Sequence, residues 1–202
     1  VAAEALQAAP QALRAALALF TAAGPLWKRL YDQDARKHRH IYAIVLFSLG
    51  VAKYKLDDDA GATQAWEDAR PLWETLYGQE PETYREEYAT LLLNLGTAKS
   101  ELNDDAGAAH AWEEARPLRK KLYEQKPERH REDYAGLLLN LGVAKHTLGN
   151  DEGAVEDFEE ARPLWGTLYG QKPKTYREDY ANVLLNLGMA KAELDDHAGA
   201  VE

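Results

Sequence analysis

The same short sequence returns four times along the chain, each time 46 residues further on. It reads VLFSLG from residue 45, LLLNLG from residues 91 and 137, and VLLNLG from residue 183. Other positions keep the same step, namely Tyr42, Tyr88, Tyr134 and Tyr180; Gly50, Gly96, Gly142 and Gly188; and Phe20, Trp66, Trp112 and Phe158. A fixed period of this length predicts an array of like units, each of which buries its apolar side against its neighbours.

Composition favours helices for these units. The strong helix formers Ala, Leu, Glu, Lys and Arg dominate the chain, whereas the strand formers Val, Ile and Thr are scarce. Hydrophobic residues make up 46% of the 202 residues, which is enough for a substantial core. We therefore predict an all-α protein.

One unit reads as two helices, here named helix A and helix B, joined by a tight turn. In the second copy an apolar stripe runs at helical spacing from residue 83 to 102, and Thr83 followed by Glu86 is typical of a capping box. Asn103 and Asp104 supply turn and N-cap chemistry before helix B, which runs to about residue 125. Helix A is predicted at 37–56, 83–102, 129–148 and 175–194, with helix B after the first three; a B-like helix at 10–33 precedes them, and residues 1–9 fit the remnant of an earlier helix A.

Small residues and prolines within a unit predict how its helices pack. Gly96 on helix A, with Ala108 on helix B, lets the two backbones approach closely while Trp112 fills the space between units. Pro117 falls inside helix B, so we expect a kink at residues 113–116. The alternative is that this proline opens a separate third helix.

The pattern N-L-G-x-A, then a turn, then G-A-x-x-x-[WF]-x-x-A resembles the tetratricopeptide repeat, a family of two-helix repeats. The residues that carry the match in the second copy are Asn94, Leu95, Gly96, Ala98, Ala108, Trp112 and Ala115, and the pattern recurs along nearly the whole chain. The period exceeds the roughly 34 residues usual in the family. In this respect it is similar to the extended repeats of kinesin-light-chain-like and bacterial regulatory arrays.

The resemblance implies an α-solenoid, a right-handed superhelix of stacked antiparallel helix pairs. We interpret residues 1–202 as a single solenoid fragment with a partial first repeat at 1–36, full repeats at 37–82, 83–128 and 129–174, and a truncated repeat at 175–202. Because the chain starts at Val1 and stops a few residues into a helix B, we expect a piece of a longer protein. The helix A at 175–194 should then expose an apolar face.

Members of the family usually bind protein or peptide segments on the concave surface lined by helix A. Projecting helix A and removing its buried stripe leaves a mostly apolar surface with amides in register. The predicted peptide-binding residues are Phe47, Val51, Leu93, Asn94, Thr97, Leu139, Asn140, Val143, Leu185, Asn186 and Met189.

The three asparagines of this set allow two interpretations. An amide donates and accepts hydrogen bonds at once, which suits an extended peptide backbone. An internal duplication copies a structural residue as faithfully as a binding one, so each Asn could instead satisfy a neighbouring helix or loop. The cations with which related domains clamp a terminal carboxylate are missing from these positions, which argues against a ligand of that kind.

Two cationic series keep the 46-residue step, Lys53, Lys99, Lys145 and Lys191, and Arg70, Arg116 and Arg162. The lysines lie at the edge of the buried stripe, where the stem can pack while the ammonium reaches a carboxylate. Recognition of an acidic ligand is the alternative. The arginines are expected to form surface ion pairs of little individual worth.

No motif indicates catalysis, a metal or a cofactor. The acidic run at residues 57–59 places Gly61 too early for an EF-hand loop and fits a helix N-terminus instead. The six histidines are scattered, cysteine is absent, and no Gly-rich phosphate loop occurs. We therefore predict that the chain is not an enzyme.

The predicted function is a protein- or peptide-binding scaffold. A formal net charge of -10 disfavours nucleic acid and anionic membranes as partners. No signal peptide pattern occurs and no apolar run approaches ~20 residues, so we expect a cytoplasmic protein, of bacterial origin by the resemblance. Two alternatives stay open: a structural segment that forms a homo-oligomer through open repeat ends, and the sensor arm of a larger bacterial signalling enzyme.

Overall fold

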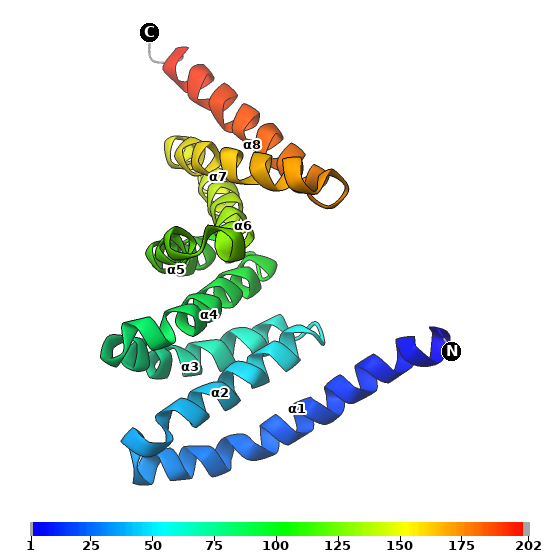
Figure 1. Ribbon diagram of the computed structural model, residues 1–202, viewed down its shortest axis with the longest axis vertical. Coiled ribbons are helices and arrows are strands. Elements are labelled where there is room, and N and C mark those ends of the chain that lie inside the picture. The colour runs from blue at the N-terminus through cyan, green and yellow to red at the C-terminus, as the bar shows by residue number, and fades with distance from the viewer. Residues whose placement is uncertain (1, 200–202) are drawn as a thin grey trace. The chain divides into compact units, whose positions relative to one another are not determined.

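The part of the chain that the structure describes is entirely helical (Figure 1). The computed structural model describes the backbone of residues 2–199 and the side chains of residues 11–195. Its helices are α1 (Ala2–Gln33), α2 (Ala35–Tyr54), α3 (Asp59–Gln79), α4 (Pro81–Glu101), α5 (Asp105–Gln125), α6 (Pro127–Thr147), α7 (Asp151–Gln171) and α8 (Pro173–Gly199). The even-numbered helices are the predicted A helices, and α3, α5 and α7 are the predicted B helices.

The helices form two compact units. Unit 1, Val1–Asn103, holds α1 to α4, and unit 2, Asp104–Glu202, holds α5 to α8. Within each unit every helix packs against the next one along the chain, and successive helices run in opposite directions (Figure 1). The predicted α-solenoid of stacked antiparallel helix pairs is thus confirmed, while its right-handed superhelical twist stays a prediction.

Three of the A helices, α4, α6 and α8, begin at a proline, and each begins two residues earlier than predicted. Pro81 opens α4 and Pro127 opens α6, where the absent N–H is not needed and the fixed φ suits the first turn. The N-cap residue of α4, Glu80, forms no side-chain cap hydrogen bond. The capping box predicted at Thr83 and Glu86 is therefore wrong, because Thr83 already lies inside the helix.

The B helices begin at a side-chain cap, as predicted for Asp104. The caps Asp58, Asp104 and Asn150 accept hydrogen bonds from the N–H groups of Gly61, Gly107 and Gly153 at 2.9, 2.9 and 3.1 Å. A Cβ at Gly107 would lie 2.1 Å from Oδ2 of Asp104, so the cap needs glycine at this position. The residue before this cap, Asn103, has a φ of 59°, a conformation that asparagine tolerates well.

The repeated hexapeptide forms the core. In both copies of LLLNLG the first, second and fourth leucines are 0% exposed, namely Leu91, Leu92, Leu95, Leu137, Leu138 and Leu141. A Cβ at Gly50 would lie 2.3 Å from the Trp66 ring, and one at Gly142 would lie 2.5 Å from the Phe158 ring. The close approach predicted for this glycine series is confirmed at these two positions, because each glycine faces the aromatic residue of the next B helix.

A pair of tyrosines joins each odd-numbered helix to the A helix after it. The pairs are Tyr31 with Tyr42, Tyr77 with Tyr88, Tyr123 with Tyr134, and Tyr169 with Tyr180, with ring centroids 5.5 or 5.6 Å apart. Separations of this size are typical of favourable aromatic contacts. The two periodic tyrosine series thus serve one repeated junction.

Each B helix runs without a break through its proline. Pro71, Pro117 and Pro163 lie inside α3, α5 and α7. The alternative that Pro117 opens a separate third helix is therefore wrong. The kink expected at residues 113–116 stays a prediction.

The first and last helices are longer than predicted. α1 is one helix from Ala2 to Gln33, so the interpretation of residues 1–9 as a separate remnant is wrong. These residues contain no Gly, Asn or Asp that would end a helix, and their alanines favour its continuation through Pro10. α8 continues to Gly199, past the predicted end at residue 194, and Tyr176 near its start leaves the helical conformation.

Candidate peptide-binding surface

The eleven predicted binding residues lie on A helices, and none of them is buried. We name those of unit 1 the unit 1 face: Phe47 and Val51 on α2, with Leu93, Asn94 and Thr97 on α4. We name those of unit 2 the unit 2 face: Leu139, Asn140 and Val143 on α6, with Leu185, Asn186 and Met189 on α8. Both faces are accessible to a ligand, although their neighbours along the helix form the core.

The unit 2 face combines an anchored apolar residue with exposed ones. α6 and α8 contact one another, and Leu139 packs against the cluster of Ala154, Phe158, Leu187 and Ala190. By contrast Val143, Leu185 and Met189 are 40%, 61% and 47% exposed. Exposed apolar side chains beside a rigid core can gain contacts with a partner at little ordering cost.

The side-chain amides of the two faces have no partner within their own unit. Asn94, Asn140 and Asn186 are half-buried, and among the described side chains their amides take part in no hydrogen bond. Their role, in ligand binding or in keeping the repeats in register, stays a prediction. The hydroxyl of Thr97, in contrast, donates to the carbonyl of Leu93 at 3.0 Å, so its donor is used within α4.

A cavity of about 260 Å³ lies between α1 and α2 of unit 1. It is lined by Leu13, Ala16, Phe20, Phe47, Ser48, Val51, Ala52 and Lys55. The cavity thus combines Phe47 and Val51 of the unit 1 face with residues of α1, which lie outside the predicted A helices. The sequence contained one indication that α1 takes part, because Phe20 belongs to the periodic aromatic series. This volume suits one or two side chains of a partner better than a whole small molecule.

The lysine series forms a ladder of ion pairs. Lys99 pairs with Glu67, Lys145 with Glu113 and Lys191 with Glu159, at 2.6, 2.7 and 2.6 Å. In each pair the lysine of an A helix reaches a glutamate on the B helix before it. Lys53 pairs instead with Asp58 at 3.5 Å. The predicted structural role of these lysines is confirmed.

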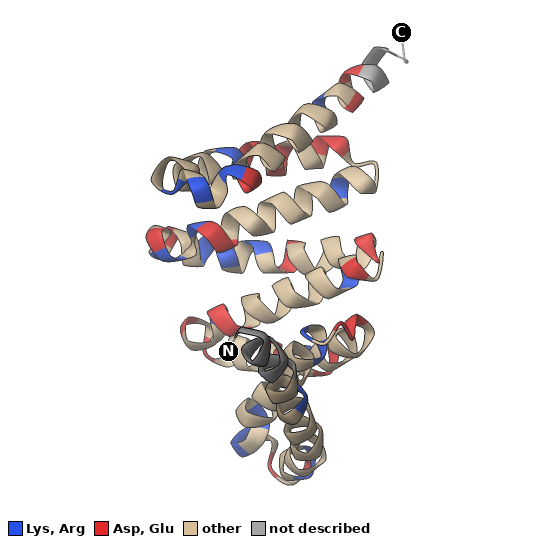
Figure 2. Cartoon of the chain, turned by 90° about the vertical axis from the view of Figure 1, so that its right-hand side faces the viewer, with Lys and Arg blue, Asp and Glu red and all other residues tan. Residues whose placement is uncertain are grey.

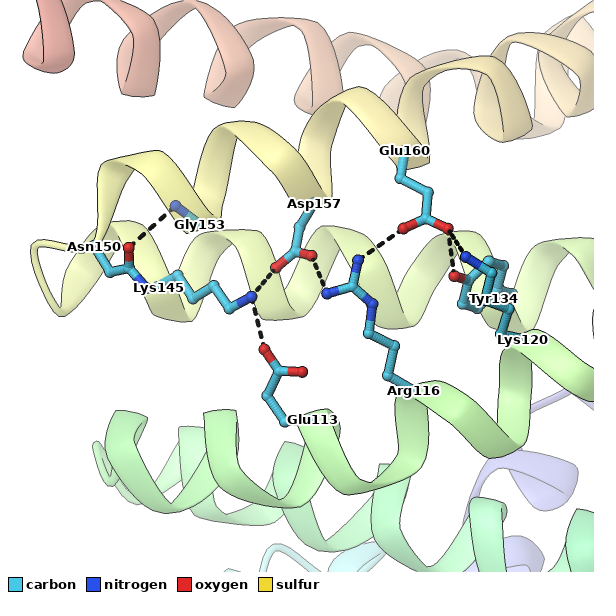
Figure 3. Close-up of polar contacts among 9 residues, drawn as sticks. All are labelled: Glu113, Arg116, Lys120, Tyr134, Lys145, Asn150, Gly153, Asp157 and Glu160. Atoms are coloured by element: carbon cyan, nitrogen blue, oxygen red, sulfur yellow. Dashed lines mark hydrogen bonds and ion pairs between the residues drawn. The ribbon is translucent and has the colours of Figure 1, made fainter.

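Asp157 on α7 is a fully buried carboxylate held by two cations. Lys145 from α6 and Arg116 from α5 reach its two oxygens at 2.7 and 2.8 Å (Figure 3). Arg116 also binds Glu160 at 2.7 Å. The prediction that Arg116 forms only a weak surface ion pair is therefore wrong, because its guanidinium serves a buried acid.

The same network extends along α7. Glu160 accepts hydrogen bonds from Tyr134 at 2.6 Å and from Lys120 at 3.0 Å, in addition to the bond from Arg116 (Figure 3). With Glu113, the network contains three carboxylates and three cations. It is thus neutral as a whole, and its charges are matched inside unit 2 rather than offered to a ligand.

The two acids of the network have opposite pKa shifts. Burial raises the pKa of Asp157, although Lys145 and Arg116 act in the other direction. Burial also acts to raise the pKa of Glu160, but hydrogen bonds from Tyr134, Arg116 and Lys120 outweigh it and lower that pKa to about 2. Burial and the bond to Glu160 raise the pKa of Tyr134. Glu160 therefore stays charged, and Tyr134 stays protonated, at neutral pH.

Charges lie away from the middle of the A helices. Residues 88–98 of α4 and 134–144 of α6 include no Lys, Arg, Asp or Glu, and uncharged stretches of this kind are visible in Figure 2, whereas α5 and α7 carry charges in their middle. Within residues 11–195, no three His, Asp or Glu side chains are placed to hold a metal ion. None of the described helices has the length and apolarity that crossing a membrane requires.

Two family models match parts of the chain. Residues 135–173, from α6 to the start of α8, match the tetratricopeptide repeat model. Residues 21–72 and 77–121 match the model of anaphase-promoting complex subunit 5. No curated protein matches the chain.

Solved structures share the fold at low sequence identity. Two structures of nearly identical TPR-like repeats from a putative kinesin light chain of Podosopora anserina are among them. One, of a variant, gives a TM-score of 0.59 at 16% identity over 95% of this chain and 92% of that one. The other gives 0.53 at 14% identity over 94% and 96%. BtubC (BKLC) from P. vanneervenii gives 0.50 at 16% identity over 92% and 85%.

Fold and repeat together define the class of protein. Stacked helix pairs with a fixed sequence period make the chain a helical-repeat protein of the α-solenoid class. Within that class it is similar to the tetratricopeptide repeat family, whose model matches residues 135–173.

Proposed function

We propose that the chain is a scaffold that binds a protein or peptide segment along its A helices. The observation that carries this proposal is the amide series of Asn94, Asn140 and Asn186, whose donors and acceptors are unused on partly exposed surfaces. The amides would bond the backbone of an extended segment, and the apolar residues of the unit 1 and unit 2 faces would contact its side chains. Binding of this kind requires no catalytic step, metal or cofactor.

The chemistry of these faces indicates the kind of segment that they would accept. Their side chains are uncharged, and Lys99, Lys145 and Lys191 on the same helices are already paired with glutamates. Lys55 lines the cavity beside Phe47 and Val51, so a cation borders only the unit 1 face. We therefore propose a ligand with alternating apolar and polar side chains and without a terminal carboxylate anchor. Nucleic acid stays excluded as a prediction from the net charge.

The test is a peptide-display selection on the whole chain, repeated with an Asn94, Asn140 and Asn186 triple alanine variant. We expect a shared motif that the variant no longer selects although its helical circular dichroism is unchanged. The chain offers a matched control: Gln79, Gln125 and Gln171 are amides at the same 46-residue step, exposed at the ends of α3, α5 and α7. Loss of selection in the glutamine variant as well, or unchanged selection in both, would contradict the proposal.

A second candidate function is assembly through open helix faces, favoured by the exposure of Leu184, Leu185 and Met189 on α8. The third hypothesis, a sensor arm of a larger bacterial signalling enzyme, stays a prediction, as does a cytoplasmic location.

A further inference from the structure

The start of α2 differs in charge from the start of the other A helices. Residues 36–40 read RKHRH, where the later copies read ETYRE at 82–86, ERHRE at 128–132 and KTYRE at 174–178. The arginine in fourth place is common to all four copies. The first copy, however, has three Lys or Arg residues and no acid, whereas each later copy keeps at least one glutamate. This stretch is therefore cationic in a chain whose formal net charge is -10.

In the second and third copies a glutamate of the same helix neutralises the common arginine. Nη1 and Nη2 of Arg85 donate to the two carboxylate oxygens of Glu82 at 2.9 and 2.7 Å. Arg131 donates to Glu128 in the same way, at 3.3 and 3.1 Å. Both contacts are two-point hydrogen bonds, which are among the stronger ways in which a guanidinium binds a carboxylate.

Arg39 in the first copy lacks this carboxylate. Arg36 stands at the position of the glutamate. The two acids that precede it in the chain bind elsewhere, because Asp32 pairs with Lys28 at 2.8 Å and Asp34 accepts the cap hydrogen bond at the start of α2. Among the residues whose side chains the structure describes, neither Arg36 nor Arg39 forms an ion pair. The guanidinium of Arg39 is thus able to receive a carboxylate from another molecule.

The equivalent positions are exposed even where further helices pack beside them. The side chain of Glu82 is 68% exposed on α4, which follows three helices of unit 1, and that of Glu128 is 78% exposed on α6, which packs on α5 and α7. In both copies the carboxylate comes from the arginine's own helix, so a neighbouring helix is not needed to supply it. An open Arg39 therefore follows from the residue at position 36.

The cations at the start of α2 do not stabilise that helix. The N-terminus of a helix has a partial positive charge, which favours acids in the first turn and disfavours Lys and Arg. The first turns of α4 and α6 contain Glu82 and Glu128, whereas the first turn of α2 contains no acid. Arg36 and Lys37 thus lower the stability of α2, and an acidic partner would offset that cost.

We propose that Arg36, Lys37 and Arg39 form a docking site for an acidic segment of a partner protein, here named the α2 cationic site. A carboxylate of the partner would bond to Arg39 as Glu82 does to Arg85. Arg36 and Lys37 are exposed and would attract the other acids of the segment. Three cations within four residues suit a short peptide segment better than the long phosphate backbone of nucleic acid, which the net charge of the chain would repel.

The α2 cationic site is separate from the surface proposed above for peptide binding. Its residues lie in the first two turns of α2, whereas Phe47 and Val51 of the unit 1 face lie in the second half of that helix. A rise of about 1.5 Å per residue separates Arg39 from Phe47 by about 12 Å along the helix axis. Failure of one proposal therefore leaves the other intact.

The test is the binding of a fluorescein-labelled peptide of eight glutamates to the full chain, measured by fluorescence anisotropy at low and at physiological salt. The parent should bind this peptide with an affinity that falls as the salt concentration rises. Arg36→Glu gives Arg39 the carboxylate that the second and third copies have, so it should weaken binding by roughly tenfold or more. Arg39→Gln, which removes the guanidinium, should weaken binding as well. Circular dichroism checks the fold of both variants.

Lys174→Glu is the matched control. It changes the net charge of the chain by the same amount as Arg36→Glu, at the equivalent position of the fourth copy, where Glu178 is already present. The affinity for the peptide should stay nearly unchanged in this variant, because the α2 cationic site is intact. A labelled single-stranded DNA of eight thymidines is the second probe, and it should bind more weakly than the peptide.

Three results would overturn the proposal. The first is a parent chain that shows no salt-dependent binding of the glutamate peptide. The second is an equal loss of affinity in Arg36→Glu and Lys174→Glu, which would indicate a response to net charge alone. The third is DNA that binds more tightly than the peptide and is released by Arg36→Glu, which would indicate a nucleic-acid site.

Discussion

Ala65 on α3 and Asp157 on α7 occupy the same repeat position but make different demands on their surroundings. Ala65 is 4% exposed and needs only apolar neighbours, whereas Asp157 is 0% exposed and needs two cations. A lysine is present at the facing position in every repeat, yet it reaches a buried acid only in α6. This backbone therefore accepts either an apolar or an ionic contact at one position, and the choice affects stability more than fold.

The strongest loss of stability should come from removing a partner of the buried acid. Lys145→Met should lower the free energy of unfolding by about 3 kcal/mol, because it leaves Asp157 with Arg116 alone. The matched control is Lys99→Met on α4, whose partner Glu67 has a side chain that is 35% exposed. That substitution should cost about 1 kcal/mol or less. Urea unfolding followed by circular dichroism measures both, and equal losses would show that burial of Asp157 does not matter.

A somewhat smaller loss is expected where α7 seats its aromatic residue. Gly142→Ala should cost about 2 kcal/mol, because the new Cβ would overlap the fully buried Phe158 ring. Gly188→Ala on α8, where a Cβ has open space, should be neutral or stabilising by up to about 1 kcal/mol through helix propensity. The melting temperatures of the two variants, measured by thermal unfolding, report this difference. A similar melting temperature for both would mean that the space beside Gly142 is not tightly filled.

The acid stability of unit 2 should depend on Glu160. Its pKa of about 2 lies below the ordinary value, so its contribution is present above pH ~4.5 and is lost as pH falls toward ~2. Asp157 has a raised pKa and therefore acts in the opposite sense, costing stability as pH rises from its ordinary pKa toward its folded pKa.

Glu160→Gln isolates the first of these contributions. The parent should be more stable than this variant by about 1 to 2 kcal/mol near neutral pH, after allowance for the partial exposure of Glu160, and the difference should shrink as pH falls below ~4.5. Urea unfolding at a series of pH values measures the difference. Asp68→Asn, the corresponding change on α3, is the control. A difference for Glu160→Gln that does not vary with pH would contradict the assigned network.

Much of this fold could be predicted because the repeat supplies several copies of each signal. The close approach at the glycines and the turn before Asp104 follow from the sequence for that reason. The start of α4 could not be predicted in the same way. Thr83 and Pro81 are both typical of a helix start and lie two residues apart, and the structure shows that the helix begins at Pro81. The length of α1 could not be predicted from the repeat either. The repeat predicts a helix end near residue 9, but residues 1–9 contain no Gly, Asn or Asp that would end a helix.

The ionic network of α7 was harder to predict than the helices. The sequence did contain an indication of the network, because Asp157 stands at a repeat position where two other copies have alanine, Ala65 and Ala111. A sequence does not show that this acid is fully buried, nor that cations from α5 and α6 both reach it. Those facts depend on three helices meeting, whereas periodicity describes one helix at a time.

The variant with the smallest expected change in the free energy of unfolding is the one that best tests whether the contacts of Ala65 on α3 and Asp157 on α7 are interchangeable. The double variant Lys145→Met with Asp157→Leu replaces an ion pair by apolar side chains of similar size, while Arg116 keeps Glu160 as its partner. Its free energy of unfolding should lie within about 1 kcal/mol of the parent, because the desolvation of both charges is removed together with their attraction. The single and double variants form a cycle, and a coupling of about 2 kcal/mol is expected between the two positions. If the double variant is instead as unstable as Lys145→Met alone, then α7 depends on the charge itself, and the repeat position is not interchangeable between an apolar and an ionic contact.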